Sequence, residues 1–131
     1  MRIPPPVAEL IGIDLVDRGE GETVFKLEAD ERHSNPMGTI HGGILCDLAD
    51  AAMGMAFFST LAEGESFTTL ELKINYLRPF WTGTLIARGK VISRGKTVGL
   101  TECRIVDDQD RLIAHATSTC MALRGDMAQG R

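Results

Sequence analysis

Residues 41–61 read HGGILCDLADAAMGMAFFSTL, and this stretch decides the fold. On a helical wheel at about 100° per residue, many of its apolar side chains fall on one stripe. The members of that stripe are Ile44, Leu45, Leu48, Ala51, Ala52 and Met55. We therefore predict a long helix, at about residues 41–61, whose stripe packs against a sheet.

The opposite side of this helix is also poor in polar residues. It carries Met53, Gly54, Phe57 and Phe58, with Asp47 and Asp50 as its only acids. A helix that is apolar nearly all round is buried on both sides, and monomers seldom tolerate an exposed apolar patch of this size. Because one chain of 131 residues has no obvious second layer, we predict that a second copy covers this side, giving at least a homodimer.

Before and after the predicted helix, the chain contains segments in which apolar and polar residues alternate, and these segments predict strands. One strand, at residues 23–29, precedes the helix, and residues 10–16 form a further short helix or strand. Four strands follow the helix, at residues 67–77, 83–93, 97–106 and 112–123. This order predicts an α+β fold with one long central helix wrapped by an antiparallel sheet of five to six strands.

The first strand after the helix alternates along its whole length. One face is expected to carry Leu70, Leu72, Ile74 and Tyr76, and the other Thr69, Glu71, Lys73 and Asn75. The length of 131 residues predicts a single domain with its core at about residues 10–123. Three consecutive prolines predict an extended arm over residues 1–9, and the polar tail 124–131 is predicted to be frayed.

The composition argues against several functions. Fourteen basic and eighteen acidic residues give a net charge of −4, which disfavours nucleic-acid binding. Asp47 and Asp50 interrupt the longest apolar stretch, so we expect no membrane span. The three cysteines form no CxxC pair and the three histidines lack metal-ligand spacing, so we expect no metal and no cofactor. The N-terminus has no apolar leader, and we therefore expect a cytoplasmic protein.

Asp50 and Gly42 indicate chemistry on the central helix. Asp50 falls on the side assigned to the partner, where a carboxylate is costly unless it is paired. It is therefore either a base or nucleophile, or a structural group bonded to the partner's backbone. Gly42 opens the helix, where free N–H groups can polarise a carbonyl oxygen. The two residues are too far apart on one helix to share a small carbonyl, but a two-fold dimer would bring Gly42 of one copy to Asp50 of the other.

The stretch NPMGTIHGGILCDLAD, residues 35–50, resembles the hotdog-fold acyl-CoA thioesterases of the PaaI-like, phenylacetate-degradation branch. Its core is HGG followed, after six intervening residues, by Asp50, with Asn35 six residues before the histidine. The segment TLELKINYLRP, residues 69–79, resembles the family's first strand after the helix. The resemblance covers roughly residues 10–123, and it implies the hotdog fold and assembly into dimers or tetramers.

The resemblance also implies roles for individual residues. Asp50 matches the family's catalytic carboxylate, which acts as nucleophile or general base, and Gly42 matches the backbone N–H that polarises the thioester carbonyl. Asn35 matches an amide that positions the thioester or water, and His41 matches a histidine with a mainly orienting role. Thr69 falls where some members carry a hydroxyl that orients the water.

Five further residues are expected to bind substrate. Gly43 adjoins the oxyanion site, while Gly54 and Phe57 are expected in the apolar cleft that holds the acyl chain. Arg94 and Lys96 are candidates for the phosphates of CoA, with a solvated hairpin tip as an equal alternative. Arg78 is a weaker candidate for the same role. The Gly89–Thr97 stretch is no P-loop, because it has one residue too many and leads into a strand.

The expected activity is hydrolysis of a medium-chain or aryl acyl-CoA, with acyl-CoA as the small-molecule partner. The lone His33 and His115 are expected in a surface loop and a strand, and no serine lies in a G-x-S-x-G elbow. One alternative is a non-catalytic acyl-CoA-binding hotdog protein, a sensor or an accessory subunit. The other is a hotdog dehydratase or hydratase, for which His41 is the candidate base.

Overall fold

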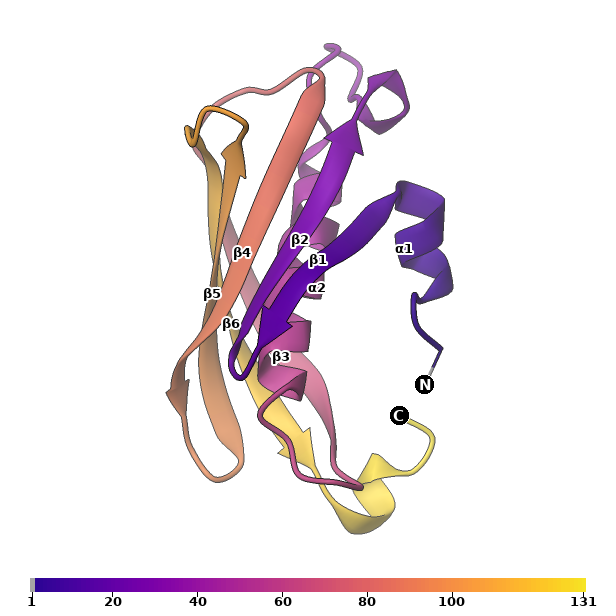
Figure 1. Cartoon of the computed structure of the whole chain (residues 1–131), viewed down its shortest axis with the longest axis vertical. Helices are drawn as coiled ribbons and strands as arrows, with labels where there is room; N and C mark the ends of the chain where they lie inside the picture. The colour runs from indigo at the N-terminus through magenta and orange to yellow at the C-terminus, as the bar shows by residue number, and fades with distance from the viewer. Residues whose placement is uncertain (1) are drawn as a thin grey trace.

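Helix α2 lies against one face of a six-stranded antiparallel sheet with the strand order β1-β2-β4-β5-β6-β3 (Figure 1). The computed structural model describes residues 2–131. Its elements are α1 (Pro6–Ile11), β1 (Ile13–Gly19), β2 (Glu22–Ala29), η1 (Glu31–His33), α2 (Gly42–Phe58), β3 (Ser66–Tyr76), β4 (Gly83–Arg94), β5 (Val98–Asp107), β6 (Leu112–Leu123) and η2 (Gly125–Ala128). One long helix and six antiparallel strands confirm the predicted α+β fold.

The chain crosses the whole sheet between β2 and β3. Strand β2 pairs with β4, from Glu22 opposite Lys90 to Ala29 opposite Gly83. Strand β3 pairs only with β6, at the far edge, from Ser66 opposite Leu123 to Tyr76 opposite Ala114. Since α2 is the connection between these two regions, it spans the concave face of the sheet and contacts all six strands.

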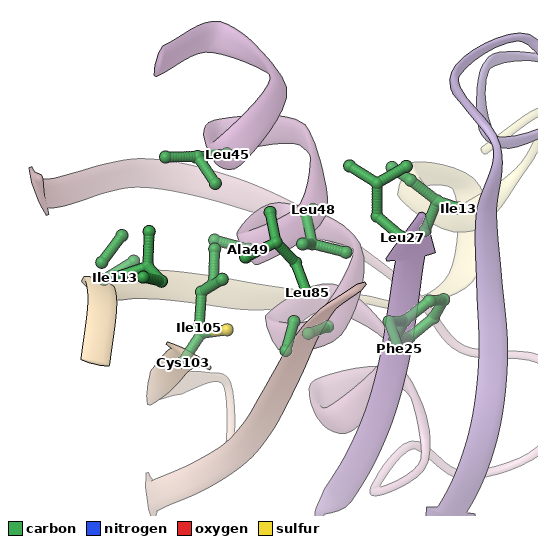
Figure 2. Close-up of a cluster of buried hydrophobic side chains, with 14 of the residues drawn as sticks. Ile13, Phe25, Leu27, Leu45, Leu48, Ala49, Leu85, Cys103, Ile105 and Ile113 are labelled. Atoms are coloured by element: carbon green, nitrogen blue, oxygen red, sulfur yellow. The ribbon is translucent and has the colours of Figure 1, made fainter. Parts of the chain in front are cut away.

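The buried side of α2 approaches the sheet very closely. A Cβ atom at Gly89 of β4 would lie 2.4 Å from the carbonyl oxygen of Ala52, so only glycine fits there. The same carbonyl accepts a 2.6 Å hydrogen bond from the hydroxyl of Thr23. Figure 2 shows Leu48 and Ala49 of the helix among Leu85, Ile105 and other apolar side chains of the strands. The core therefore lies between α2 and the sheet.

The wheel places four residues on the wrong side of the helix. Ala51 and Met55 were expected on the stripe facing the sheet, but both are half-buried and line the cavity on the open side. Met53 and Phe57 were expected on the side facing a second copy, but both are 0% exposed within the single chain. Phe57 packs against the ring of Phe67, at 5.8 Å between centroids, and against Gly99, where a Cβ would lie 2.7 Å from its ring. The expectation fails because the sheet wraps around α2 and covers more of its circumference than a flat layer would.

The open side of α2 is consequently narrow. It carries the exposed Asp47 and Asp50, together with the half-buried Ala51, Met55 and Phe58. The apolar surface that argued for a second copy is smaller than the wheel suggested, and the homodimer remains a prediction. None of the helices within residues 2–131 is both long and apolar enough to span a bilayer.

At the C-terminal end of α2, side-chain hydroxyls take the place of backbone N–H groups as hydrogen-bond donors to the helix carbonyls. The hydroxyls of Ser59 and Thr60 donate to the carbonyls of Ala56 and Phe57, at 2.7 and 2.6 Å. These bonds satisfy carbonyls that the next turn would otherwise use. The helix is therefore three residues shorter at this end than the predicted range of 41–61.

Both ends of the chain contain a short helical segment that the sequence did not predict. Residues 6–11, partly inside the expected extended arm, form α1, because Pro6 has the fixed φ that suits the first helical position. Gly12 ends this helix at φ 93°, and its N–H donates to the carbonyl of Ala8. The tail expected to fray forms η2, and Arg124 just before it is paired with Glu65.

Strand β3 contains one extra residue that breaks its alternation. Thr69 pairs with Cys120 and Glu71 pairs with Thr119, so Leu70 is a bulge without a partner on β6. Leu70 is 53% exposed, unlike the half-buried Leu72 and Ile74 with which it was expected to share a face. Because the bulge absorbs one residue, Thr69 lies on the same face as Leu72, toward the helix, and not with Glu71 on the outer face as expected.

Candidate active site

Asp50 lies halfway along the open side of α2. The hydroxyl of Thr69 donates to its Oδ1 at 3.4 Å. Solvent reaches the carboxylate from one side, while the surrounding protein atoms desolvate it and raise its pKa. The hydrogen bond from Thr69 lowers the pKa of Asp50, and the charge of Asp47 raises it, with a net rise above the ordinary value. A carboxylate in this state is a suitable general base or nucleophile.

The bulge at Leu70 is what brings Thr69 to Asp50. In a strand of unbroken alternation, Thr69 and Leu72 would lie on opposite faces. With Leu70 extruded, both face α2, and the Thr69 hydroxyl comes within reach of the carboxylate. Bulges often re-aim a side chain beside an active site. The structure thus brings together Asp50 and Thr69, two residues predicted from the sequence.

An apolar cavity of about 220 Å³ opens beside this pair. Asp50 and Thr69 are its only polar lining residues, and the remaining walls come from residues 3–8, strands β1 and β2, α2 and Phe67. Gly54 lies in the wall as predicted, and a Cβ there would approach the ring of Phe67 to 3.2 Å. Phe57 does not line the cavity because it is buried in the core. The cavity is therefore an apolar pocket with one polar corner, formed by Asp50 and Thr69.

The start of α2 forms a second polar region. His41 is the N-cap, and its Nδ1 accepts the N–H of Gly43 at 2.9 Å, so the Gly43 N–H is occupied. The N–H of Gly42 has no acceptor within residues 2–131. Tyr76 donates from its hydroxyl to the carbonyl of Gly42 at 3.0 Å, and a Cβ at Gly42 would lie 2.8 Å from the Tyr76 ring. This geometry fixes a free N–H donor at the helix terminus, where an oxyanion is stabilised.

Tyr76 was not predicted as a site residue. Partial desolvation by neighbouring atoms, and then the contact of the hydroxyl with the thiol of Cys46 at 3.6 Å, raise the pKa of Tyr76 to about 12. The phenol therefore stays protonated and keeps donating to Gly42. The sequence holds no signal for this contact, because Tyr76 reads only as the next apolar position of an alternating strand.

Asn35 lies near Gly42 but its side chain is engaged in its own loop. Its amide nitrogen donates to the Thr39 hydroxyl at 2.8 Å, and its Oδ1 accepts the N–H of Met37 at 3.0 Å. Asn35, Gly42 and Tyr76 line a common groove of about 380 Å³. Asp50 lies eight positions after Gly42 on the helix, about 12 Å along the axis. One chain therefore holds the two parts of the predicted site separately.

The two candidate phosphate contacts lie at the other end of α2. Arg94 donates from Nε to the Thr60 hydroxyl at 2.9 Å, and its guanidinium lies 4.7 Å from the ring centroid of Phe57. Phe57 is about 22 Å from Gly42 along the helix axis. Lys96 is exposed at the neighbouring turn. The structure does not bring either residue to Gly42 of the same chain.

The remaining histidines have structural partners. His33, expected in a surface loop, is buried: its Nδ1 accepts the N–H of Asp30 at 3.1 Å, and its Nε2 lies 2.7 Å from the carbonyl oxygen of Ile11. The prediction missed this because the short η1 turn folds back on α1. His115, on β6, pairs through Nε2 with Glu102 at 2.7 Å.

Comparison with known proteins places this geometry in a family. Residues 37–114 match the thioesterase superfamily. A 1,4-dihydroxy-2-naphthoyl-CoA hydrolase of Listeria monocytogenes is 30% identical over 111 residues, which cover 85% of this chain and 90% of the relative. The human acyl-coenzyme A thioesterase 13 is 28% identical, covering 82% and 77% of the two chains. The PaaI protein of the E. coli phenylacetic acid degradation operon superposes with a TM-score of 0.86 at 29% identity, covering 93% and 87%.

The chain therefore belongs to the thioesterase superfamily and is a thioester hydrolase with the hotdog fold. The resemblance stated from residues 35–50 is confirmed, as is the predicted class of enzyme. The family match begins at Met37 and includes Gly42, Asp50 and Thr69.

Proposed function

We propose that the protein hydrolyses acyl-CoA thioesters with a medium-chain or aryl acyl group. The observation that carries this proposal is the Asp50 carboxylate, held by Thr69 at the edge of an otherwise apolar cavity. Such a pairing suits a substrate whose reacting carbonyl is attached to an apolar group. The relatives named as CoA hydrolases support CoA as the thiol part.

The catalytic step uses water activated by Asp50. The carboxylate takes a proton from water, and the water oxygen bonds to the thioester carbon, while the carbonyl oxygen becomes an oxyanion that accepts the Gly42 N–H. The carbon–sulfur bond then breaks, its electron pair leaves with sulfur, and sulfur receives the proton from Asp50. The products are the free acid and CoA. Direct attack by Asp50 through an acyl-enzyme anhydride is the alternative route.

Two copies of the chain are needed to complete this site. Gly42 and Asp50 of one chain are about 12 Å apart along the helix, too far to act on one carbonyl. A two-fold dimer with neighbouring α2 helices supplies Gly42 from one copy and Asp50 from the other. The narrow open side of α2, which carries Asp50, is the surface that such a pairing would use.

The size of the cavity supports the proposed acyl groups. A cavity of roughly 150 Å³ suffices to hold benzene in a protein interior. The cavity beside Asp50 has about 220 Å³, enough for one aromatic ring and a short linker or for a folded medium chain. The acyl group therefore lies among Gly54, Met55 and Phe67, and not against Phe57 as expected from the sequence.

Release of free CoA thiol from a panel of acyl-CoAs tests the proposal. Wild-type protein should release thiol most rapidly from medium-chain and aryl substrates, and Asp50→Ala should slow release at least about a hundredfold without changing the oligomer. Tight acyl-CoA binding with no release from any substrate would instead establish the non-catalytic alternative. Hydration of an enoyl-CoA without thiol release would establish the dehydratase or hydratase alternative.

A further inference from the structure

We propose that the adenine nucleotide of CoA binds in a pocket formed by the β3–β4 loop and the β5–β6 turn, between Arg78, Trp81 and Arg111. This inference rests on the proposed function, because it names the site for the non-reacting end of the same substrate. The pocket has a volume of about 510 Å³. Its lining is Arg78, Pro79, Phe80, Trp81, Thr82, Asp107, Arg111 and Ile113.

The charge of this pocket suits phosphate groups. Arg78 is exposed and makes no ion pair within residues 2–131. Arg111 donates from Nε to Oδ2 of Asp107 at 2.6 Å, which leaves the two terminal NH₂ groups of its guanidinium free. Guanidinium groups bind phosphates through paired hydrogen bonds. The lining thus offers two cations against a single carboxylate.

The carboxylate of Asp107 is committed to holding Arg111 in place. Its side chain is 1% exposed, and its Oδ1 accepts the N–H groups of Gln109 and Arg111, each at 2.9 Å. All of these contacts lie within the β5–β6 turn, and together they fix the orientation of the Arg111 guanidinium. Asp107 therefore positions a phosphate-binding cation, and both of its carboxylate oxygens already accept hydrogen bonds within the turn.

The pocket also offers an aromatic surface. Trp81, the only tryptophan of the chain, is 57% exposed, which leaves much of its indole in water. Exposed aromatic rings flanked by arginines are typical platforms for stacking a nucleic-acid base. An adenine stacked on Trp81 would place its phosphates within reach of Arg78 and Arg111.

The pocket is joined to the oxyanion end of the proposed site. Arg78, Pro79 and Phe80 also line the groove that contains Gly42. The carbonyl of Phe80 accepts the N–H of Ile40 at 2.7 Å, which fastens this loop to the segment leading into α2. A substrate whose thioester carbonyl binds at the Gly42 N–H can therefore run its pantetheine arm along the groove to the nucleotide pocket.

Other cationic places on the chain are not connected in this way. A smaller pocket on the outer face of the sheet carries Arg88, Lys90 and Arg104, but the sheet separates it from α2. Arg94 is committed to Thr60 and Phe57 at the far end of α2. Among the cationic groups of the described residues, Arg78 and Arg111 combine free guanidinium nitrogens with access to the Gly42 groove.

Binding of adenosine 3′,5′-bisphosphate by titration calorimetry tests the pocket without any hydrolysis. The variants are Arg78→Ala and Trp81→Ala, since both side chains are exposed and their loss should not affect folding. Each should weaken binding about tenfold, the loss expected for one charged hydrogen-bonded contact or one stacked base. Lys96→Ala and Arg104→Ala are matched controls that should bind as wild type. Unchanged binding in both test variants, or an equal loss in Lys96→Ala, would overturn the proposal.

Kinetics with two thioesters separate this proposal from the proposed function. With acyl-CoA, Arg78→Ala and Trp81→Ala should raise KM about tenfold and leave kcat unchanged. With the same acyl group on N-acetylcysteamine, which has no nucleotide, they should match wild type. A KM increase on both thioesters would overturn the nucleotide pocket. If wild type hydrolyses neither thioester, the proposed function fails, and weaker nucleotide binding in the variants would still support the pocket.

Discussion

The two sides of helix α2 differ in what their contacts accomplish. On the buried side, Gly89 admits the Ala52 carbonyl so closely that no side chain fits between helix and sheet. On the open side, Asp50 has one hydrogen bond of 3.4 Å and a cavity beside it. Close packing on one side makes the helix a rigid support. Loose packing on the other leaves room for a substrate, so changes on the two sides should affect different measurements.

The largest effect is expected on the open side. Asp50→Ala should lower kcat for thioester hydrolysis by about 10²- to 10⁴-fold, the usual contribution of a general base. Thermal unfolding should be unchanged or shifted upward, because a partly desolvated carboxylate is removed. Asp47→Ala, one turn earlier on the same side, is the control and should retain nearly full kcat. Strong destabilisation by Asp50→Ala would show that the two sides are not separable.

A change on the buried side of α2 should lower the stability of the fold more than it lowers kcat. In Gly89→Ala, the new Cβ would lie 2.4 Å from the Ala52 carbonyl oxygen, so helix and strand must separate. We expect a loss of about 1–3 kcal/mol in the free energy of unfolding, measured by urea denaturation. Gly19→Ala is the matched control, since a Cβ there meets no atom within 4 Å. Equal stability of the two variants would contradict the close helix–sheet contact.

A substitution at the N-terminal end of α2 should lower activity more than it lowers stability. In Gly42→Ala, the new Cβ would lie 2.8 Å from the Tyr76 ring, an exposed side chain that can move aside. Displacing the ring or the helix start misplaces the Gly42 N–H, and we expect kcat to fall about 10- to 100-fold. Combining Gly42→Ala with Tyr76→Ala removes the clash. If the double variant recovers no activity, the loss does not arise from the Tyr76 contact.

The smallest effect concerns pH. Since Asp50 must be ionised to act as a base, kcat should fall as pH drops through a pKa above the ordinary value of aspartate. Thr69→Val removes a hydrogen bond that lowers the pKa of Asp50, so the acidic limb should move to higher pH. The pH profile of kcat for both proteins measures this shift. A profile that moves to lower pH would contradict the assignment of the limb to Asp50.

The same pKa determines how stability depends on pH. The folded protein binds a proton at Asp50 more readily than the unfolded chain, so this group lowers stability as pH rises through the two pKa values. Asp50→Asn should therefore raise the free energy of unfolding at neutral pH. The difference from wild type should shrink at pH values below the ordinary pKa of aspartate.

Much of the fold followed from local sequence patterns. Each of the five strands predicted over residues 23–123 agrees with the structure to within one residue at either end, because their period-2 alternation and polar turns are local signals. The motif at residues 35–50 correctly indicated the family. These features depend on residues close together in the chain, which a single sequence displays directly.

The errors arose where distant segments meet. A helical wheel contains no information on how far the sheet wraps around α2, so Met53 and Phe57 were placed on the wrong side. The three prolines hid α1, since proline suits both an extended arm and the first turn of a helix. The contact of Tyr76 with Gly42 joins residues 34 positions apart. Such contacts become visible only in three dimensions.

The bulge at Leu70 divides strand β3 into two parts whose side chains alternate in opposite phase. Up to Thr69, odd-numbered residues face the helix, whereas from Leu72 onward even-numbered residues do. A related chain without the extra residue would present the same faces with a strand one residue shorter. Its alignment to this chain then needs a single-residue gap inside a strand, at position 70. Without that gap, the counterpart of Thr69 would be sought on the wrong face of the sheet.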